Sequence, residues 1–302
     1  MCSLRIMVSL LLLTVLPTSS AQSHSHPEIE KSSLRHALHA ALAGTPATAL
    51  VLDVSNGSLL ASEEPQDAAQ IHSAPGSILK PFFLAGALES GVVQPQATVL
   101  CHRNLRILGH NLSCSHPQTN VAFNAEEALA YSCNTYFADL ASRLSGEQAV
   151  AVLREYGLGQ SPSSSSESSA HLRPHTTRED TQLLVLGLAG IRVSPAETAV
   201  AFRKLALRFD NSSVLAPVEH GMLNSVRYGA AHKAEVPNLK IAGKTGTASD
   251  PGQTWTHGWF AGIAGEGSTR IVVVVYLPHG NGADAATIAR RFLLALKAWQ
   301  AQ

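Results

Sequence analysis

Apolar residues recur at helical spacing near both ends of the chain. One stripe lies in residues 29–42 and the other follows Asp284. The positions that share a face are Leu34, Leu38 and Leu42 in the first stripe, and Ile288, Phe292, Leu296 and Trp299 in the second. This spacing predicts an amphipathic helix at each end, with Asp284 as the cap of the last one.

Runs of apolar and β-branched residues between these helices are typical of buried strands. Residues 47–54 form one such run, and Ser55-Asn56-Gly57 is a turn signal that leads into a returning strand at 58–61. Further strands are predicted at 239–242, 259–263 and 270–277.

The middle of the chain is predicted to be mainly helical, with segments at 77–90, 125–144, 147–156 and 194–207. Residues 101–120 are expected to form an irregular loop, and the serine-rich stretch 161–169 a mobile surface loop. The order of elements predicts an α+β fold. An antiparallel sheet would be flanked by the N- and C-terminal helices, with an all-helical subdomain and the active site between them.

The first residues carry the pattern of an export signal. Arg5 is followed by an apolar run from Ile6 to Leu16 and by small residues that end at Ala21. This run is much shorter than the about 20 apolar residues of a transmembrane helix, so we expect a signal peptide cleaved near Ala21. An uncleaved anchor is the alternative. The expected division is a signal peptide at 1–21, a segment with the first helix at 22–44, and one periplasmic or extracytoplasmic domain at 45–302.

Composition changes this picture little. The chain has 302 residues, of which 45% are hydrophobic, and that is ample for a sizeable core. The 22 basic and 22 acidic side chains give a formal net charge of zero. No basic block is present, so we expect no nucleic-acid partner.

Four cysteines need an assignment. Cys2 would leave with the signal peptide. Cys101 and Cys114 flank a short segment, and in an oxidising compartment they could form a disulfide worth roughly 3 kcal/mol. Two reduced, buried thiols are the alternative. Cys133 would remain unpaired as a small packing residue.

The fourteen histidines are scattered along the chain. None pairs with another at His-x-x-x-His spacing beside an acidic residue. His36 and His39 lie three apart on the first predicted helix, where solvated surface residues are the simpler interpretation. No metal site is predicted.

Ser77 and Lys80 lie one turn apart at a predicted helix start. The breaker pair Pro75-Gly76 precedes them, so unpaired backbone N–H groups would surround the Ser77 hydroxyl. A serine hydroxyl needs a base to become a good nucleophile, and a buried lysine beside a second cation can lose its charge and act as that base. Lys80 has the spacing for this role, and Lys244 is the candidate second cation.

Ser132 and Asn134 lie two residues apart at a predicted break between helical stretches. Ser132 could relay a proton between the lysine, the nucleophile and the leaving group. Asn134 could hydrogen-bond a substrate amide. Taken alone, such a polar pair is more often a local backbone cap.

A third pattern, Lys244-Thr245-Gly246, stands beside Thr247 on a predicted strand. Gly246 would allow another backbone to approach closely. The N–H of Thr247 and that of Ser77 would together form a two-donor oxyanion hole. Lys244 and a neighbouring hydroxyl would hold a substrate carboxylate.

Each pattern occurs once, and the set resembles the transpeptidase domain of penicillin-binding proteins, within the serine acyltransferases that include serine β-lactamases. The resemblance covers roughly residues 45–300. The segments that carry it are 74–82, 127–137, 187–195, 243–248 and 257–260.

The resemblance implies a D,D-transpeptidase or D,D-carboxypeptidase that acts on peptidoglycan stem peptides ending in D-Ala-D-Ala. Ser77 would attack the penultimate carbonyl and form an acyl-enzyme. Lys80 would be the general base, Ser132 the proton relay and Asn134 the amide contact. The sequence does not separate the two activities, because they share the acylation step.

The resemblance also assigns Lys244 and Thr245 to the terminal carboxylate of the substrate. β-Lactam antibiotics would acylate Ser77 as covalent inhibitors, and no metal or organic cofactor is implied. Family members that synthesise the wall usually carry an N-terminal pedestal or a glycosyltransferase domain, which residues 22–44 are too short to form. We therefore expect a bare catalytic domain, which a cell-wall protein partner could localise.

Two alternatives are a serine β-lactamase and a non-enzymatic β-lactam- or peptide-sensing domain. The chain has no Glu-x-x-Leu-Asn type segment that would supply a deacylating carboxylate. Ser132-Cys133-Asn134 also differs from the Ser-x-Val version that accompanies a carboxylated lysine. Sensor domains are usually attached to a membrane segment, and no run beyond residue 16 is apolar enough to span a bilayer.

Overall fold

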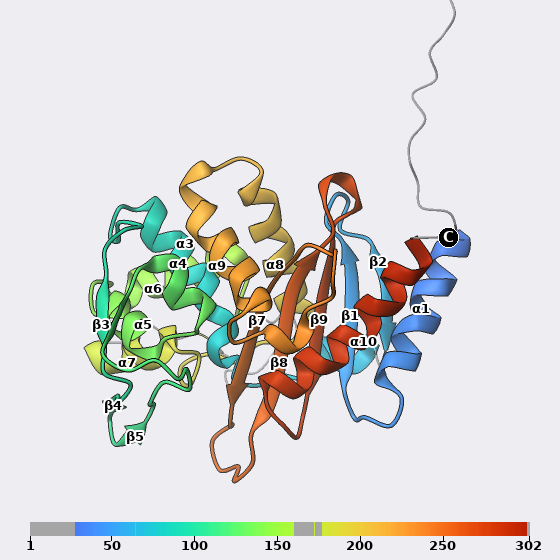
Figure 1. Ribbon diagram of the computed structural model, residues 1–302. Coiled ribbons are helices and arrows are strands. Elements are labelled where there is room, and N and C mark those ends of the chain that lie inside the picture. Colours follow the sequence, from blue (N-terminus) through green and yellow to red (C-terminus); the bar gives the residue numbers. More distant parts are fainter. Residues whose placement is uncertain (1–27, 64, 160–171, 173–176, 301–302) are drawn as a thin grey trace, which may run out of the picture.

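The computed structural model describes residues 28–63, 65–159, 172 and 177–300. The predicted signal peptide at 1–21 and the serine-rich segment at 161–169 lie outside the described residues. A central sheet has the first and last helices packed against it and a helical subdomain beside it (Figure 1). None of the helices in the described ranges is long and apolar enough to cross a membrane.

The sheet has five antiparallel strands in the order β2-β1-β9-β8-β7. Their bounds are β1 Thr48–Asp53, β2 Leu59–Glu63, β7 Ile241–Ala248, β8 His257–Ala264 and β9 Ile271–Leu277. The predicted turn joins β1 to β2, and in it the Asp53 carboxylate accepts the N–H groups of Ser55 and Asn56 at 2.7 and 3.1 Å. Such Asx contacts stabilise a tight reversal of the chain.

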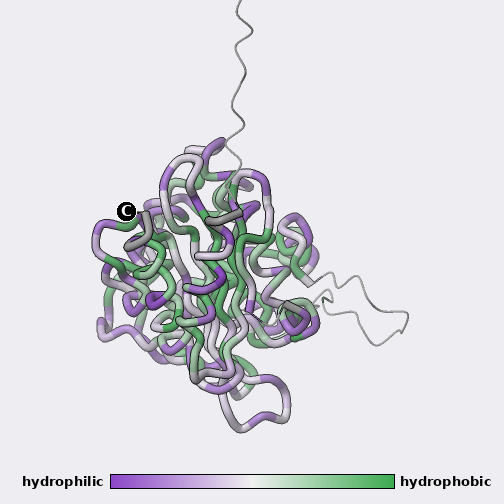
Figure 2. Tube along the Cα trace, turned by 90° about the vertical axis from the view of Figure 1, so that its right-hand side faces the viewer, coloured by the Kyte–Doolittle hydropathy of each residue, from purple (hydrophilic) through white to green (hydrophobic). Residues whose placement is uncertain are grey.

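Alternate residues of β9 belong to different hydrophobic clusters. Val272 and Val274 pack with α8 (Pro195–Phe209) and the helical subdomain, whereas Val273 and Val275 pack with α1 (Glu28–Leu42) and α10 (Gly282–Gln300). Because both faces of the sheet are covered, the strand is hydrophobic throughout. Each buried valine contributes about 1.5–3 kcal/mol to stability. Figure 2 shows the hydrophobic segments running through the middle of the molecule.

The helical subdomain is built from the middle of the chain. Its helices and 3₁₀ turns are η1 Gly76–Leu79, α3 Lys80–Glu89, α4 Ala125–Ala130, α5 Asn134–Ala141, α6 Gly146–Tyr156, α7 Arg178–Val185, η2 Ser213–Leu215 and α9 Ala216–Arg227. Its short strands are β3 Val99–Cys101, β4 Arg106–Ile107, β5 His110–Asn111 and β6 Val121–Phe123. The remaining elements are α2 Pro65–Gln70, η3 His232–Ala234 and η4 Gly267–Thr269.

The predicted α+β architecture is confirmed, with local corrections. The stretch 101–120 is not wholly irregular, because β3 pairs with β6 and β4 pairs with β5. The Lys-Thr-Gly stretch lies inside β7, since its pairing with β8 runs without a break from Ile241 to Ala248. At the start of α10, Asn281 and not Asp284 is the cap: the Asn281 side chain accepts the Ala283 N–H at 2.8 Å, and the Asp284 carboxylate accepts the Asn281 N–H at 3.0 Å.

Gly187 allows a close approach of two backbones just before Ser77. It has a φ of +72°, and an ideal Cβ there would lie 2.1 Å from the Gly76 carbonyl oxygen. The Gly76 N–H donates to the Gly187 carbonyl at 2.9 Å, which ties the two segments together. The neighbouring bridge between Ser73 and Val193 continues this contact.

We therefore expect Gly187→Ala to destabilise the fold more than Gly91→Ala does. Gly91 has a similar φ of +70° but nothing within 4 Å of an ideal Cβ, so Gly91→Ala would add only the left-handed strain of about 1–2 kcal/mol. Gly187→Ala adds a backbone clash to that strain. Denaturant unfolding of both variants measures the difference, and equal losses would show that the close approach is not needed.

Candidate active site

The three sequence patterns lie on three separate elements that meet at one place. Ser77 lies in η1, Ser132 in the turn between α4 and α5, and Lys244 in β7. Lys80 and Lys244 both donate to the Ser132 hydroxyl, at 3.2 and 2.8 Å. The structure thus brings together two lysines that stand 164 positions apart in the chain, from Lys80 to Lys244.

Ser77 and Lys80 are fixed by a change of helix type. Ser77 is half-buried in the 3₁₀ turn, and the Lys80 N–H donates to the Ser77 carbonyl. The α-helix α3 begins at Lys80, with Pro81 in its first turn, where no backbone donor is required. Gly76, which precedes Ser77, has a φ of +55°, a conformation that favours glycine. The predicted helix start is therefore confirmed, as a 3₁₀ turn that leads into an α-helix.

Ser132 has a left-handed backbone with a φ of +55°. This conformation costs a non-glycine residue about 1–2 kcal/mol, and it is kept only where surrounding contacts hold it. The Ser132 carbonyl accepts Lys80 Nζ at 2.9 Å, and the Cys133 N–H donates to the Ala128 carbonyl at 2.9 Å. The strained turn directs the Ser132 hydroxyl to both lysines.

Asn134 connects Lys80 to the loop that precedes α4. Its side-chain oxygen accepts Lys80 Nζ at 2.6 Å, and its amide nitrogen donates to the Leu112 carbonyl at 2.9 Å. The side-chain amide still offers a second N–H and a second lone pair. The contact with Lys80 goes beyond the substrate role that the sequence suggested, because it also holds the lysine in place.

Burial lowers the pKa values of both lysines. Lys80 is fully buried, and removal from water lowers its pKa to about 8, although negative charge on the nearby Cys133 and Cys114 sulfurs acts in the opposite direction. Burial and then the neighbouring Lys80 lower the pKa of Lys244 well below its ordinary value. Neither lysine forms a salt bridge with a carboxylate within the described ranges. The uncharged form needed for a general base is therefore accessible near neutral pH.

The threonines of β7 have different surroundings. Thr245 is buried and its hydroxyl donates to the Ala230 carbonyl at 3.2 Å. Thr247 is exposed, and its hydroxyl accepts the Gly282 N–H at 2.9 Å. Lys244 Nζ also donates to the Thr245 carbonyl at 3.0 Å. Thr247 is thus the β7 hydroxyl that is open to solvent.

Glycines let β7 lie directly against η1. An ideal Cβ on Gly246 would lie 2.3 Å from the Pro75 carbonyl, and one on Gly76 would lie 3.0 Å from the Thr247 nitrogen. The backbone of Thr247 therefore adjoins the segment that carries Ser77. This proximity is what an oxyanion hole formed by the N–H groups of Ser77 and Thr247 requires, and the role itself stays a prediction.

Three side chains hold the backbone of Ala74, and we call them the Ala74 clamp. The sequence did not predict this arrangement. The Ala74 carbonyl accepts His257 Nε2 at 2.7 Å and Trp259 Nε1 at 3.0 Å, and its N–H donates to the Asp250 carboxylate at 3.0 Å. His257 and Trp259 are two apart on β8, so their alternation on a strand could have shown a shared face. No sequence signal indicated Asp250. The clamp fixes the chain three residues before Ser77.

The suggested disulfide between Cys101 and Cys114 is absent from the structure. Cys101, Cys114 and Cys133 are free and buried, and the sulfurs of Cys101 and Cys114 lie 3.6 Å apart. A disulfide bond would require about 2.05 Å. Cys133 and His116 lie against the same two thiols, which the sequence did not indicate.

Comparison with known proteins gives one family. A model of the penicillin binding protein transpeptidase domain matches residues 47–294. The peptidoglycan D,D-transpeptidase PbpA of Mycobacterium tuberculosis is 25% identical over 205 residues, which cover 54% of this chain and 42% of that protein. The chain therefore matches less than half of the length of this curated relative.

Solved structures share the fold. A peptidoglycan glycosyltransferase from Burkholderia ambifaria superposes with a TM-score of 0.75 at 22% identity, covering 89% of this chain and 96% of that one. The transpeptidase domain of Burkholderia pseudomallei penicillin-binding protein 3 gives a TM-score of 0.75 at 22% identity, covering 90% and 93%. With the family match over residues 47–294, these findings show that the chain belongs to the penicillin-binding protein transpeptidase family.

Proposed function

We propose that this chain is an exported D,D-acyltransferase that forms an acyl-enzyme through Ser77. Its substrates would be peptidoglycan stem peptides ending in D-Ala-D-Ala. The observation that carries the proposal is the environment of Lys80, which lies one helical turn after Ser77. Lys80 is fully buried, its amine has a pKa of about 8, and it donates to the Ser132 hydroxyl. The curated relative PbpA is a peptidoglycan D,D-transpeptidase, and this supports a wall peptide as the substrate.

In the proposed acylation, the neutral Lys80 amine takes the Ser77 proton as the Ser77 oxygen bonds to the penultimate carbonyl carbon. The N–H groups of Ser77 and Thr247 would stabilise the oxyanion. The Ser132 hydroxyl, which lies between the amines of Lys80 and Lys244, would pass a proton to the leaving nitrogen as the peptide bond breaks. Free D-Ala would leave, and water or a wall amine would then take the acyl group from Ser77.

The substrate carboxylate would bind at β7, next to Lys244 and the threonines that follow it. Thr247 offers the exposed hydroxyl, whereas Thr245 is buried against Ala230. A bound carboxylate favours the charged form of a nearby lysine. Because a charged amine disfavours a second charge beside it, a Lys244 charged by the bound carboxylate would favour the neutral form of Lys80 that the reaction needs.

The first test is covalent labelling with a fluorescent penicillin. We expect the unmodified protein to form a stable adduct and Ser77→Ala to form none, since no nucleophile remains. Lys80→Ala should label about 10²–10⁴-fold more slowly, the usual contribution of a general base. Lys233→Ala, an exposed lysine, is the control and should label normally. Normal labelling of Lys80→Ala would refute the assigned base.

The second test is the pH dependence of that labelling. The neutral lysine is the reactive form, so the rate should rise with pH and level off above about pH 8, the pKa of Lys80. If Lys80 kept an ordinary pKa of 10.5, the rate would still be rising at pH 10. A rate that does not change between pH 6 and pH 9 would also contradict the role of Lys80.

The third test separates the activities that share an acyl-enzyme. A synthetic pentapeptide ending in D-Ala-D-Ala should release D-Ala, and an added amine acceptor should appear in the product if the enzyme is a transpeptidase. Release without incorporation would identify a carboxypeptidase. Rapid, repeated hydrolysis of a chromogenic cephalosporin, in place of stoichiometric trapping, would instead favour a β-lactamase.

A further inference from the structure

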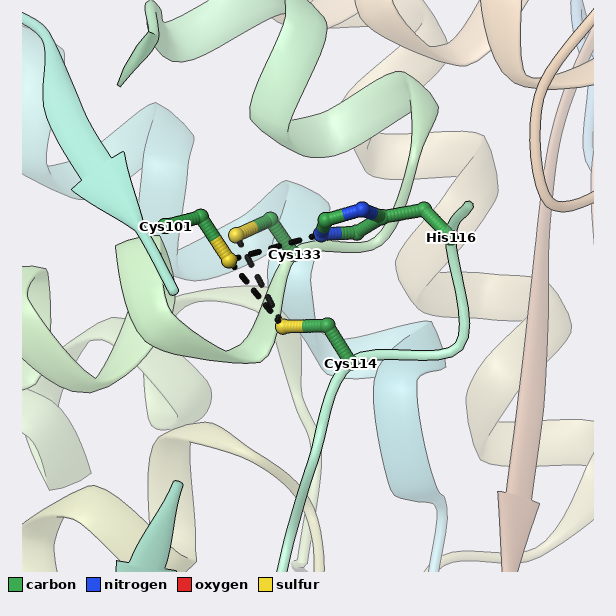
Figure 3. Close-up of side chains that lie close together, drawn as sticks. All are labelled: Cys101, Cys114, His116 and Cys133. Atoms are coloured by element: carbon green, nitrogen blue, oxygen red, sulfur yellow. Dashed lines mark hydrogen bonds between the residues drawn. The ribbon is translucent and has the colours of Figure 1, made fainter. Parts of the chain in front are cut away.

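Four buried side chains next to the active site point toward one another (Figure 3). They are Cys101 at the end of β3, Cys114 and His116 in the segment after β5, and Cys133 beside Ser132. Their three sulfurs and one imidazole nitrogen all lie within 4.8 Å of one another. They come from three separate parts of the chain, so the spacing along the sequence did not reveal them.

Three distances in this cluster match the separations between ligands around one metal ion. Tetrahedral zinc with bonds of about 2.3 Å to sulfur and 2.0 Å to nitrogen places neighbouring sulfurs about 3.8 Å apart, and sulfur about 3.5 Å from nitrogen. The observed Sγ–Sγ distances are 3.6 Å for Cys101–Cys114 and 3.8 Å for Cys114–Cys133. Cys101 Sγ lies 3.5 Å from His116 Nε2. A disulfide would bond two of the three sulfurs and would leave the third thiol without a bond.

His116 supplies an independent indication. Its side chain is about 95% buried, at 5% exposure, and packs edge-on against Phe123 with the ring centroids 5.0 Å apart. Its Nδ1 atom is buried and makes no hydrogen bond within the described part of the chain. Among the residues with a described position, the hydrogen-bond partner of its Nε2 atom is the weak one, Cys101 Sγ. A metal ion bound to Nε2 would replace this weak thiol contact with a strong one, and Nδ1 would then carry the proton of the bound imidazole.

We propose that Cys101, Cys114, His116 and Cys133 form a closed Cys₃His site for one zinc ion. Three thiolates with one imidazole favour a soft or borderline cation, and four protein ligands leave no open position for catalysis. Each thiol that binds loses its proton to solvent, so zinc binding would release up to three protons. The site is structural, and it does not depend on the proposed acyltransferase activity.

Backbone and hydroxyl groups around the sulfurs suit thiolates. The Asn134 N–H donates to Cys114 Sγ at 3.2 Å, and the Arg103 N–H donates to Cys101 Sγ at 3.4 Å. As a thiol, Cys101 donates to the Thr135 hydroxyl at 3.4 Å, and this hydroxyl can rotate to donate once Cys101 is a thiolate. Hydrogen bonds of this kind orient metal ligands and stabilise their charge.

The proposed zinc ion would hold Ser132 and Asn134 in place. Cys133 stands between Ser132 and Asn134, and Cys114 accepts the N–H of Asn134. Two residues before Cys114, the Leu112 carbonyl holds the Asn134 side chain, whose oxygen accepts Lys80 Nζ. The metal would thus fasten the loop before α4 to the strained Ser132 turn, and through Asn134 would position Lys80. This positioning role rests on the proposed function.

The experiment measures zinc in the full chain after purification under reducing conditions. We expect about one equivalent in the unmodified protein and a loss of more than about tenfold in Cys101→Ser and His116→Ala. His110→Ala is the matched control: His110 is exposed on β5, outside the cluster, and its variant should keep the metal. Titrating the metal-free protein with Co²⁺ should give the sulfur-to-cobalt charge-transfer bands of a tetrahedral thiolate site.

These readouts separate the metal site from its role in catalysis. A chain that holds no zinc and shows no charge-transfer bands refutes the site, as does a His116→Ala variant that keeps its zinc. In protein purified without reductant and then denatured, the loss of two of the three thiols of Cys101, Cys114 and Cys133 would reveal the disulfide instead. Chelated protein and His116→Ala should also label more slowly with penicillin. If zinc is lost but penicillin labelling does not change, the zinc site is supported and its role in positioning the catalytic residues is refuted.

Discussion

Two lysine amines buried around one serine hydroxyl are the constraint on which the site depends. Lys80 and Lys244 both donate to Ser132, and neither has a carboxylate partner within the described ranges. Lowering the pKa of Lys80 from 10.5 to about 8 corresponds to about 3 kcal/mol against its charged form. This burial favours the uncharged amine, which can accept a proton, over the charged amine, which cannot.

The rest of the molecule holds these groups together. β7 supplies Lys244 and lies against η1, where Gly246 and Gly76 allow backbone contact that any side chain would prevent. The strained turn at Ser132 is fixed by Lys80 and, in our proposal, by a metal beside Cys133. The sheet itself is stabilised by apolar packing on both faces, so polar groups of the site need not contribute to the stability of the fold.

Local patterns were enough for much of the fold and for the order of the three motifs along this chain. The spacing of apolar residues predicted α10, and an unbroken run of apolar, β-branched residues predicted β9. The helix α9 (Ala216–Arg227) was missed, since Gly221 and Ser225 interrupt its buried apolar stripe. Gly221 is there because α4 lies against it: an ideal Cβ would be 2.9 Å from the Glu126 carbonyl. Asp250 and the Cys₃His cluster depend on contacts between distant segments, which no local pattern records.

The most direct measurement is an NMR titration of the lysine side chains with isotope-labelled lysine, with Lys80→Arg used to assign the Lys80 signal. We expect the Lys80 amine to lose its proton near pH 8, well below the ordinary lysine value of 10.5. A Lys80 signal that titrates together with the exposed lysines would contradict the conclusion that burial supplies an uncharged base.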